Sequence, residues 1–300
     1  MICSASALPV SIMAVMRRII HFLQCLKLPP IILIILHIIL LRRFSAYNTK
    51  RTFKMKKAVP LTAAVLAAAV MPQSAVIAAD TTKIGYGQGT ACDNKNRPVD
   101  AVAFNSRFSG LGAYALTEDD SRIIISFDQG YENGYTAKIL DTLRDKGVSA
   151  IFFLTGDYAK KEPELVKRMI AEGHTLGNHG MTHASLPTLS DDKAKEEIMS
   201  LHNFVLNNYG YEMQYFRFPC GEYSEHSLEI VNGCGYKTLF WSFAYKDWLT
   251  DSQPLPGDGL KKLTESAHGG EILLLHSVSS TNAAILGEVI DNFRAKGFTV

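Results

Sequence analysis

The sequence predicts an α/β protein whose parallel strands form either an open sheet or a closed barrel. From Arg122 to the end of the chain one pattern recurs: a helical stretch, a glycine and a short apolar strand. Glycine just past a helix takes the left-handed cap conformation, so each unit is a helix followed by a strand. Such alternation requires parallel strands. Polar residues stand where these strands end, and parallel strands bring their carboxyl ends to one edge.

The expected elements follow in order along the chain. The first strand covers residues 123–127 in "RIIISFDQGYENGY". Five more strands lie in "LRDKGVSAIFFLT", "IAEGHTLGNH", "NNYGYEMQYFRFP", "NGCGYKTLFWS" and "AHGGEILLLH", and a candidate seventh lies in the terminal "RAKGFTV". Helices are expected near residues 133–146, 162–172, 190–208, 224–232, 258–268 and 282–296.

The basic residues of the 300-residue chain are concentrated before residue 80. Ten of the 31 lysines and arginines precede that position, and none of the 29 acidic residues does. The remainder therefore carries 21 basic and 29 acidic side chains, a formal net charge of −8 instead of +2. An acidic globular part argues against a nucleic-acid partner.

Residues 55–79 are expected to be a signal peptide. The stretch "MKKAVPLTAAVLAAAVMPQSAVIAAD" has two lysines, a short apolar segment and small residues near its end, which is the pattern of a cleavable secretory signal. An uncleaved membrane anchor is the alternative. We expect a secreted or cell-envelope protein that contacts the membrane only through an uncleaved N-terminal segment.

Residues 1–54 are expected to be an overlong gene start, because a signal peptide that begins at Met55 places the start of translation there. The alternative is a real membrane segment, although the Ile-rich run from Ile31 to Leu41 is short for a spanning helix. Beyond the signal peptide we expect an N-terminal extension over 80–120 and the main domain over 121–300.

Three cysteines remain outside the N-terminal segments: Cys92, Cys220 and Cys234. An odd number in an exported domain does not describe a disulfide framework. One bridge can form, and the sequence does not select its partners.

Two histidines in "NHGMTH" follow the third strand. His179 and His183 are four residues apart, and imidazoles at that spacing can share one metal ion such as zinc. Two solvated loop histidines are the alternative, but their expected position opposite Asp128 favours a shared site.

Asp128 and Arg217 are expected to pair across the sheet. Asp128 follows the first strand, where it can cap the next helix or act as a general base. Arg217 follows the fourth strand and alternates with Phe216 and Phe218. An arginine in that position needs a carboxylate partner, and Asp128 is the available one.

His276 closes the apolar stretch "EILLLHS" of the sixth strand. A hydrogen-bonded core histidine is one interpretation. With Asp247 nearby to hold a ring nitrogen, His276 becomes a candidate general acid. Trp248 and Leu274 are expected to be core residues or the wall of a pocket for an acetyl methyl group.

Five stretches together resemble the ordered motifs of the polysaccharide deacetylases, carbohydrate esterase family 4. They are "SFDQGYENGY", "NHGMTHASL", "RFPCGEYS", "FWSFAYKDW" and "LLLHSVSSTN". The resemblance covers roughly residues 97–300, and it is closest to the muramic-δ-lactam-forming peptidoglycan de-N-acetylases of spore-forming bacteria.

This resemblance implies a deformed parallel (β/α) barrel of about seven strands and a divalent metal, with zinc expected. By position, Asp128 would be the catalytic base, and His179 and His183 the metal ligands. Gln129 stands where the family usually has a second aspartate that binds the metal. This departure from the pattern predicts a weaker site.

The remaining motif positions imply further roles. Arg217 would hold Asp128, and Asp247 would tune His276, the acid that protonates the leaving amine. The backbone N–H of Cys220, where an aromatic residue often stands in the family, would help to form the oxyanion hole. Trp248 and Leu274 would line the acetyl pocket.

We therefore expect an exported hydrolase, a monomer, that removes N-acetyl groups from a cell-wall glycan, peptidoglycan, with N-acetylmuramic acid as the sugar. A chitin-oligosaccharide or xylan deacetylase is the alternative among enzymes. A non-catalytic glycan-binding module is the alternative of another class; Gln129 favours it, whereas the retained acid and base residues oppose it.

Overall fold

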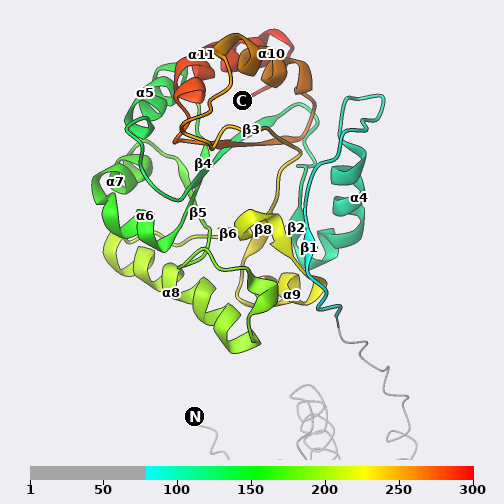
Figure 1. Cartoon of the computed structure of the whole chain (residues 1–300), viewed down its shortest axis with the longest axis vertical. Coiled ribbons are helices and arrows are strands. Elements are labelled where there is room, and N and C mark those ends of the chain that lie inside the picture. The colour runs from blue at the N-terminus through cyan, green and yellow to red at the C-terminus, as the bar shows by residue number, and fades with distance from the viewer. Residues whose placement is uncertain (1–78) are drawn as a thin grey trace, which may run out of the picture. The chain divides into compact units, whose positions relative to one another are not determined.

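Eight parallel strands form one curled sheet, in the order β2-β8-β6-β5-β4-β3-β10-β9. The computed structural model describes residues 79–300, and Figure 1 shows its helices around the outside of the sheet. The strands are β2 (Ala113–Tyr114), β3 (Ile123–Gln129), β4 (Ile151–Leu154), β5 (Thr175–Asn178), β6 (Tyr215–Phe216), β8 (Lys237–Leu239), β9 (Phe243–Ala244) and β10 (Glu271–His276). A separate antiparallel pair joins β1 (Ile84–Gly85) to β7 (Glu222–Tyr223).

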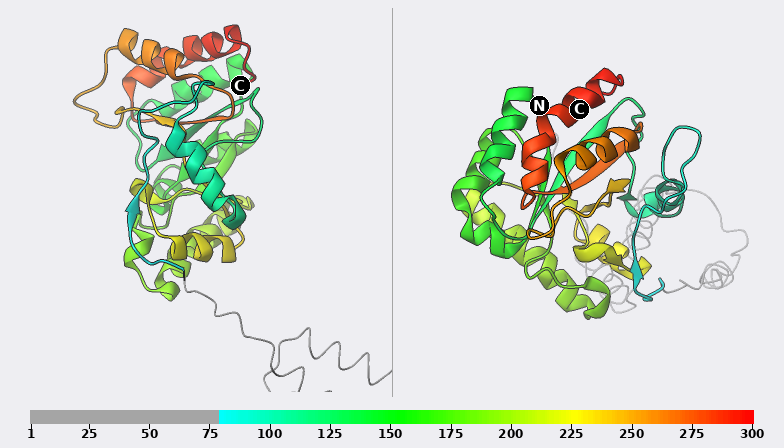
Figure 2. Two further views of the ribbon diagram at one scale, coloured as in Figure 1. Left: turned by 90° about the vertical axis from the view of Figure 1, so that its right-hand side faces the viewer. Right: turned by 45° about the horizontal axis from the view of Figure 1, so that its top comes forward.

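Helices lie between most successive strands of the sheet, as parallel strands require. They are α4 (Val99–Phe108), α5 (Thr136–Lys146), α6 (Gly156–Lys161), α7 (Pro163–Ala171), α8 (Asp191–Tyr209), α9 (Glu225–Gly233), α10 (Pro256–Ser266) and α11 (Ser280–Ala295). Helices α10 and α11 pack side by side on the outside of the barrel (Figure 2).

The deformed parallel (β/α) barrel predicted from the sequence is confirmed. The six expected strands and six expected helices are present within a few residues of their predicted bounds. The terminal "GFTV" does not form a seventh strand, since only one bridge joins Thr299 to Arg122. The sheet instead gains the edge strands β2 and β9, each of two residues, which are too short to leave a periodic signal.

Glycine caps end two of these helices as the sequence pattern indicated. Gly147 after α5 and Gly210 after α8 have φ of 62° and 65°, the left-handed region that lacks a steric penalty only for glycine. Each chain reversal then leads into the next strand.

The barrel has an inner and an outer apolar face. On β4, Phe152 belongs to the large core between sheet and helices, whereas Phe153 belongs to a small cluster with Leu239 and Ile272. Side chains of a strand point alternately to opposite faces, so consecutive residues serve different cores. The inner cluster supports the polar residues at the carboxyl edge.

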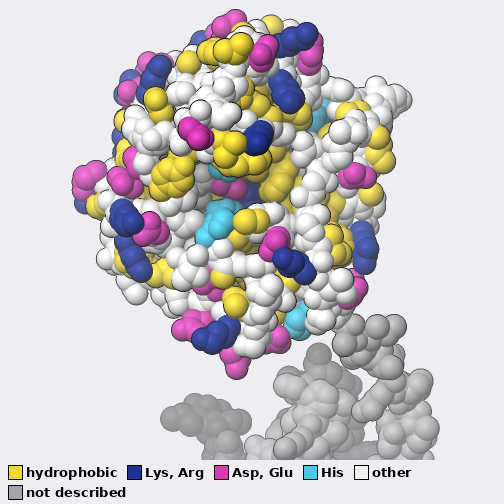
Figure 3. Space-filling view, in the orientation of Figure 1, with side chains coloured by type: hydrophobic (Ala, Val, Ile, Leu, Met, Phe, Trp, Pro, Cys, Tyr) yellow, Lys and Arg dark blue, Asp and Glu magenta, His cyan; other side chains and the backbone are white. Residues whose placement is uncertain are grey.

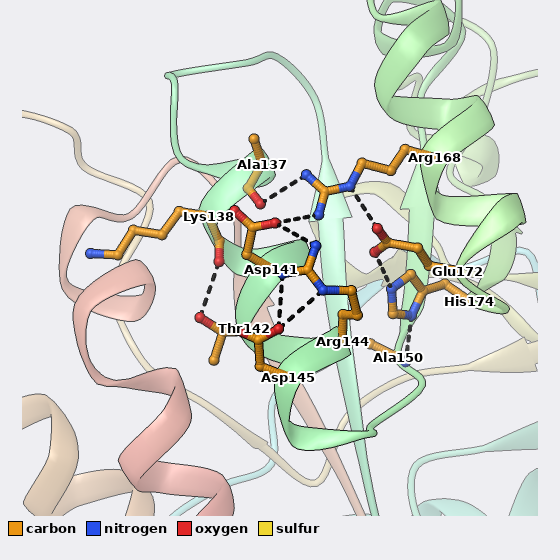
Figure 4. A network of polar contacts seen from close by, with 10 residues as sticks. All are labelled: Ala137, Lys138, Asp141, Thr142, Arg144, Asp145, Ala150, Arg168, Glu172 and His174. Atoms are coloured by element: carbon orange, nitrogen blue, oxygen red, sulfur yellow. Dashed lines mark hydrogen bonds and ion pairs between the residues drawn. The ribbon is translucent and has the colours of Figure 1, made fainter.

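On the outer surface, a polar network ties α7 to α5 (Figure 4). Arg168 donates to Asp141 at 2.6 Å and to the backbone oxygen of Ala137 at 3.2 Å, and it also pairs with Glu172. Ion pairs this exposed contribute little to stability, typically less than about 1 kcal/mol each.

The segment before residue 121 packs against the barrel as well as supplying β2. Tyr86, just after β1, donates its hydroxyl to the backbone oxygen of Trp241 at 2.6 Å. The side chain of Gln88 accepts from Trp241 Nε1 at 2.9 Å and donates to the backbone oxygen of Ala244 at 3.0 Å.

The predicted gene start over 1–54 and the predicted signal peptide over 55–79 lie outside the described residues, apart from Ala79. Between residues 79 and 300, no helix is both long and apolar enough to cross a membrane. Cys92, Cys220 and Cys234 are all free thiols.

Candidate active site

A cleft of about 550 Å³ opens at the carboxyl edge of the sheet. Asp128, His179, His183 and His276 line it, and they also line an adjoining cavity of about 380 Å³. Figure 3 shows histidine side chains in a hollow near the centre of this face, with hydrophobic side chains around them. The sheet topology thus brings together residues that are up to 148 positions apart in the chain.

Asp128 and Arg217 form the buried ion pair that the sequence predicted. Arg217 Nη1 donates to Asp128 Oδ1 at 2.9 Å, and Arg217 is completely buried. Burial of Asp128 acts to raise its pKa, but the charge of Arg217, with smaller contributions from His179 and His276, outweighs this effect and holds the pKa below 3.8. Asp128 is therefore a carboxylate at neutral pH.

Arg217 is held by a full set of acceptors. Its Nε donates to the backbone oxygen of Leu239 at 2.9 Å, and its Nη2 donates to Ser126 Oγ at 2.9 Å and to the backbone oxygen of Phe240 at 3.1 Å. The guanidinium also stacks 4.0 Å from the ring centroid of Phe153. Its planar fork suits such a fixed arrangement, so Arg217 fixes the orientation of Asp128.

His276 is held by Asp247, also as predicted. Its Nδ1 lies 2.8 Å from Asp247 Oδ1, and its backbone N–H donates to Asp247 Oδ2 at 2.8 Å. Burial acts to lower the pKa of His276, but the hydrogen bond to Asp247 and the negative charge of Asp247 raise it above 6.5. The ring is thereby prepared to carry a proton on Nε2.

His179 is set up differently from His276. Its Nδ1 lies 2.8 Å from the backbone oxygen of Arg217, which can only accept, so Nδ1 carries the hydrogen. Burial lowers the pKa of His179 to about 4, and the ring is neutral at pH 7. Its Nε2 therefore presents a lone pair, 3.5 Å from Asp128 Oδ2.

Two electron-rich atoms that face each other in this way fit a cation. The His183 ring lies 4.8 Å from that of His179, centroid to centroid, and neutral imidazoles are common ligands of divalent metals. Within residues 79–300, no group of three or more His, Cys, Asp or Glu side chains is arranged to hold a metal ion. The donor set thus fits a divalent ion through two histidines, with fewer anionic ligands than a strong site has.

Gln129 lies apart from the histidines. Ser126 and Asp128 contact Arg217 from one face of β3, so Gln129, the next residue, belongs to the opposite face. Its Nε2 donates to Ser277 Oγ, and its buried Oε1 has no hydrogen-bond partner among residues 79–300. Gln129 lines neither of the cavities that the histidines line.

The remaining predicted residues line the cleft. Cys220 has a left-handed backbone (φ 56°, ψ 10°), and its N–H donates to no other described residue. Trp248 is 46% exposed, with its ring centroid 5.6 Å from that of His276, whereas Leu274 is buried. An available N–H beside an apolar wall suits a site for an acyl group.

Several supporting residues were not predicted from the sequence. Asn282 donates to Asp247 Oδ2 at 2.6 Å and thereby fixes the partner of His276. Ser126 bonds Arg217, and Gln88 and Trp241 form part of the cleft wall. The quoted fifth motif contains Asn282, but its contact joins residues 35 positions apart and has no local sequence pattern.

A carboxylate on a buried arginine, facing a histidine on a second carboxylate, defines the acid–base site of a hydrolytic enzyme. The sequence pattern of the family described as polysaccharide deacetylase matches residues 115–239. The chain is 35% identical over 239 residues to the peptidoglycan-N-acetylmuramic acid deacetylase PdaA of Bacillus subtilis. This alignment covers 79% of this chain and 90% of PdaA.

Solved structures agree with this likeness. The structure of Bacillus subtilis PdaA, a family 4 carbohydrate esterase, superposes with a TM-score of 0.69 and 36% identity, covering 73% of this chain and 94% of PdaA. A family 4 carbohydrate esterase from Bacillus anthracis superposes with a TM-score of 0.62 and 34% identity, covering 74% and 95%. A peptidoglycan-N-acetylglucosamine deacetylase of Bacillus cereus is 28% identical over 63% of this chain and 90% of its own length.

The chain belongs to the polysaccharide deacetylase family, carbohydrate esterase family 4. The protein is accordingly an enzyme of the deacetylase class, as the motifs in its sequence implied.

Proposed function

We propose that this protein removes N-acetyl groups from peptidoglycan and that N-acetylmuramic acid is the sugar on which it acts. The observation that carries the proposal is the alignment of Asp128 with His276 on neighbouring strands, each held by its own partner. The likeness to PdaA, over most of both chains, supports peptidoglycan as the polymer and N-acetylmuramic acid as the sugar.

In the proposed reaction, Asp128 accepts a proton from water as the water oxygen attacks the acetyl carbonyl carbon. Arg217 keeps the Asp128 carboxylate ionised and correctly oriented. The Cys220 N–H stabilises the developing oxyanion, and Leu274 and Trp248 pack against the acetyl methyl group. The carbon–nitrogen bond then breaks, and His276 gives its proton to the leaving amine. The products are acetate and a free amino sugar.

A divalent ion, with zinc expected, would be held by His179 and His183 and would supply Lewis acidity beside Asp128. The lone pair of His179 Nε2 supports this assignment, because the carbonyl of Arg217 fixes the tautomer that presents it.

Export forms a further part of the proposal. The sequence pattern of residues 55–79 supports it, and the mature chain would begin near Asp80. Mass spectrometry of the secreted protein tests this part, since a product that retains residues 1–54 would contradict both the signal peptide and a start at Met55.

Acetate release tests the activity. The purified protein should release acetate from glycan strands that contain N-acetylmuramic acid more rapidly than from N-acetylglucosamine oligomers of equal length. Equal or faster release from the N-acetylglucosamine oligomers would favour the second candidate, an N-acetylglucosamine deacetylase, to which the Bacillus cereus relative points. Binding without acetate release from any glycan would favour a binding module.

A further inference from the structure

Lys246 has a backbone position that its two neighbours fix. Tyr245 and Asp247 are both buried, and both bond the side chain of Asn282 on α11, Tyr245 through its hydroxyl and Asp247 through Oδ2. In the parallel pairing of β9 with β10, Ala244 is opposite Leu274. β9 ends at Ala244, and Lys246 stands two residues beyond it, directly before the Asp247 that bonds His276.

The side chain of Lys246 is exposed and lines the 550 Å³ cleft together with Asp128 and His276. It is the one lysine or arginine among the residues that line this cleft. Within residues 79–300 its ammonium group makes no ion pair and no hydrogen bond. The Asp128 carboxylate, the acidic group of the cleft, is already paired with Arg217.

The residues 80–300 carry a formal charge of −8, and several surface lysines pair with carboxylates, such as Lys146 with Asp291 and Lys161 with Asp157. An unpaired ammonium group beside the acid–base residues is therefore available to an anion on the substrate. Lysine acts in such a site as a point charge on a flexible stem, which suits a mobile carboxylate.

The chemistry of the amino sugar supplies such an anion. N-Acetylmuramic acid differs from N-acetylglucosamine by a lactyl ether on O3. This oxygen is bonded to C3, the carbon next to the one that bears the acetamido group. When the acetamido group lies between Asp128 and His276, the lactyl group must project to the immediate surroundings of that site. Its free carboxylate carries one negative charge, whereas an amide at the same position carries none.

We propose that Lys246 is a specificity-determining residue that binds the substrate carboxylate and selects muramic acid units whose lactyl carboxylate is free. This inference rests on the proposed function. It adds the residue that recognises the sugar and the charge of its lactyl group. Trp248, exposed beside His276, provides an apolar surface on which the sugar ring can stack.

The test compares kcat and KM for acetate release on four matched substrates: N-acetylmuramic acid-containing oligomers with free lactyl carboxylates, the same oligomers as methyl amides, the same oligomers with stem peptides, and N-acetylglucosamine oligomers. Lys246→Gln should lower the kcat/KM ratio of free acid over methyl amide about 10-fold, the scale of one charge-assisted contact. The change should appear mainly in KM. Lys246→Arg should restore most of the ratio.

Lys261→Gln is the matched control, because Lys261 is an exposed lysine of α10 outside the cleft. It should leave the ratio unchanged. If Lys246→Gln keeps the wild-type ratio of free acid over methyl amide, or lowers kcat/KM equally on all four substrates, Lys246 does not bind the carboxylate.

The four substrates distinguish a lactyl carboxylate from a stem-peptide carboxylate. They also distinguish failure of the proposed function from failure of the inference about Lys246. Faster turnover of the peptide-bearing oligomers than of the free acid, with that preference lost in Lys246→Gln, would assign the contact to a stem-peptide carboxylate and overturn the lactyl assignment. A wild-type protein without preference for muramic acid would overturn the proposed function and this inference together. A wild-type preference for muramic acid that survives undiminished in Lys246→Gln would overturn this inference alone.

Discussion

Asp128 and His276 are register partners on the adjacent parallel strands β3 and β10. Each is held by a residue from elsewhere in the chain, Asp128 by Arg217 and His276 by Asp247. The two pairs have opposite consequences. Arg217 holds the pKa of Asp128 low, which favours the form that accepts a proton, while Asp247 holds the pKa of His276 high, which favours the form that donates one.

Asp128→Asn should lower kcat/KM about 100-fold or more, the usual scale for losing a general base. Asparagine retains an oxygen for Arg217, so the circular dichroism spectrum should remain that of the wild type. Asp141→Asn, the same substitution in the outer network of Figure 4, is the matched control and should retain activity. Near-native acetate release by Asp128→Asn would show that another group takes the proton. His276→Ala should cause a loss of similar size.

Asp247→Asn should shift the alkaline limb of the pH–rate profile to lower pH, since it removes the negative charge and the acceptor that raise the pKa of His276. His276 must be protonated to donate, and its raised pKa keeps it protonated at higher pH than an ordinary histidine. The measurement is kcat between pH 5 and pH 9. An alkaline limb at the wild-type position would mean that His276 is not the acid that this limb reports.

Glu271→Gln should weaken the pH dependence of stability. Burial raises the pKa of Glu271 to about 8 in the folded protein, from 4.5, and its Oε1 has no hydrogen-bond partner in the described part of the chain. The unfolded chain releases this proton first, so the stabilisation present below pH 4.5 is lost as the pH rises through about 8.

Glutamine cannot ionise, and its Oε1 can still accept from the His268 N–H, as Glu271 Oε2 does. The free energy of unfolding of Glu271→Gln relative to wild type should therefore rise by roughly 3–4 kcal/mol between pH 5 and pH 8 in urea titrations. Glu164→Gln, at an exposed position of α7, should follow the wild type. Parallel curves for Glu271→Gln and wild type would exclude a buried, neutral Glu271.

Gln129→Asp should leave zinc affinity at the wild-type value, because position 129 belongs to the face of β3 opposite Asp128 and lines neither cavity that the two histidines line. Titration calorimetry measures the affinity, with Gln129→Asn as the neutral control. A rise of about 10-fold or more in Gln129→Asp alone, a size known for changes around metal ligands, would place position 129 in the metal shell. Wild-type activity that resists chelators would instead remove the metal from the mechanism.

Much of the barrel could be predicted because its signals are local. Each expected helix ends near a glycine or leads into an apolar run, as Gly147 and Gly210 show. The two-residue strands β2 and β9 could not be predicted, since they exist only through pairing with β8 and β10. The contact of Asp128 with Arg217 could be predicted, because a buried arginine between two phenylalanines requires an anionic partner.

The sequence by itself determined which residues bear the chemistry and at which edge of the sheet they lie, because helix caps, strand periodicity and motif order depend on neighbours in the chain. Only the tertiary structure decided the protonation, orientation and pairing of those residues. The tautomer of His179 follows from the carbonyl of Arg217, and the face taken by Gln129 follows from the register of β3. Among residues 79–300 the ammonium group of Lys246 has no carboxylate partner, and this too follows from which carboxylates fold within its reach. Protonation, orientation and pairing depend on atoms brought together from distant parts of the chain, and those distances are set only when the sheet curls around them.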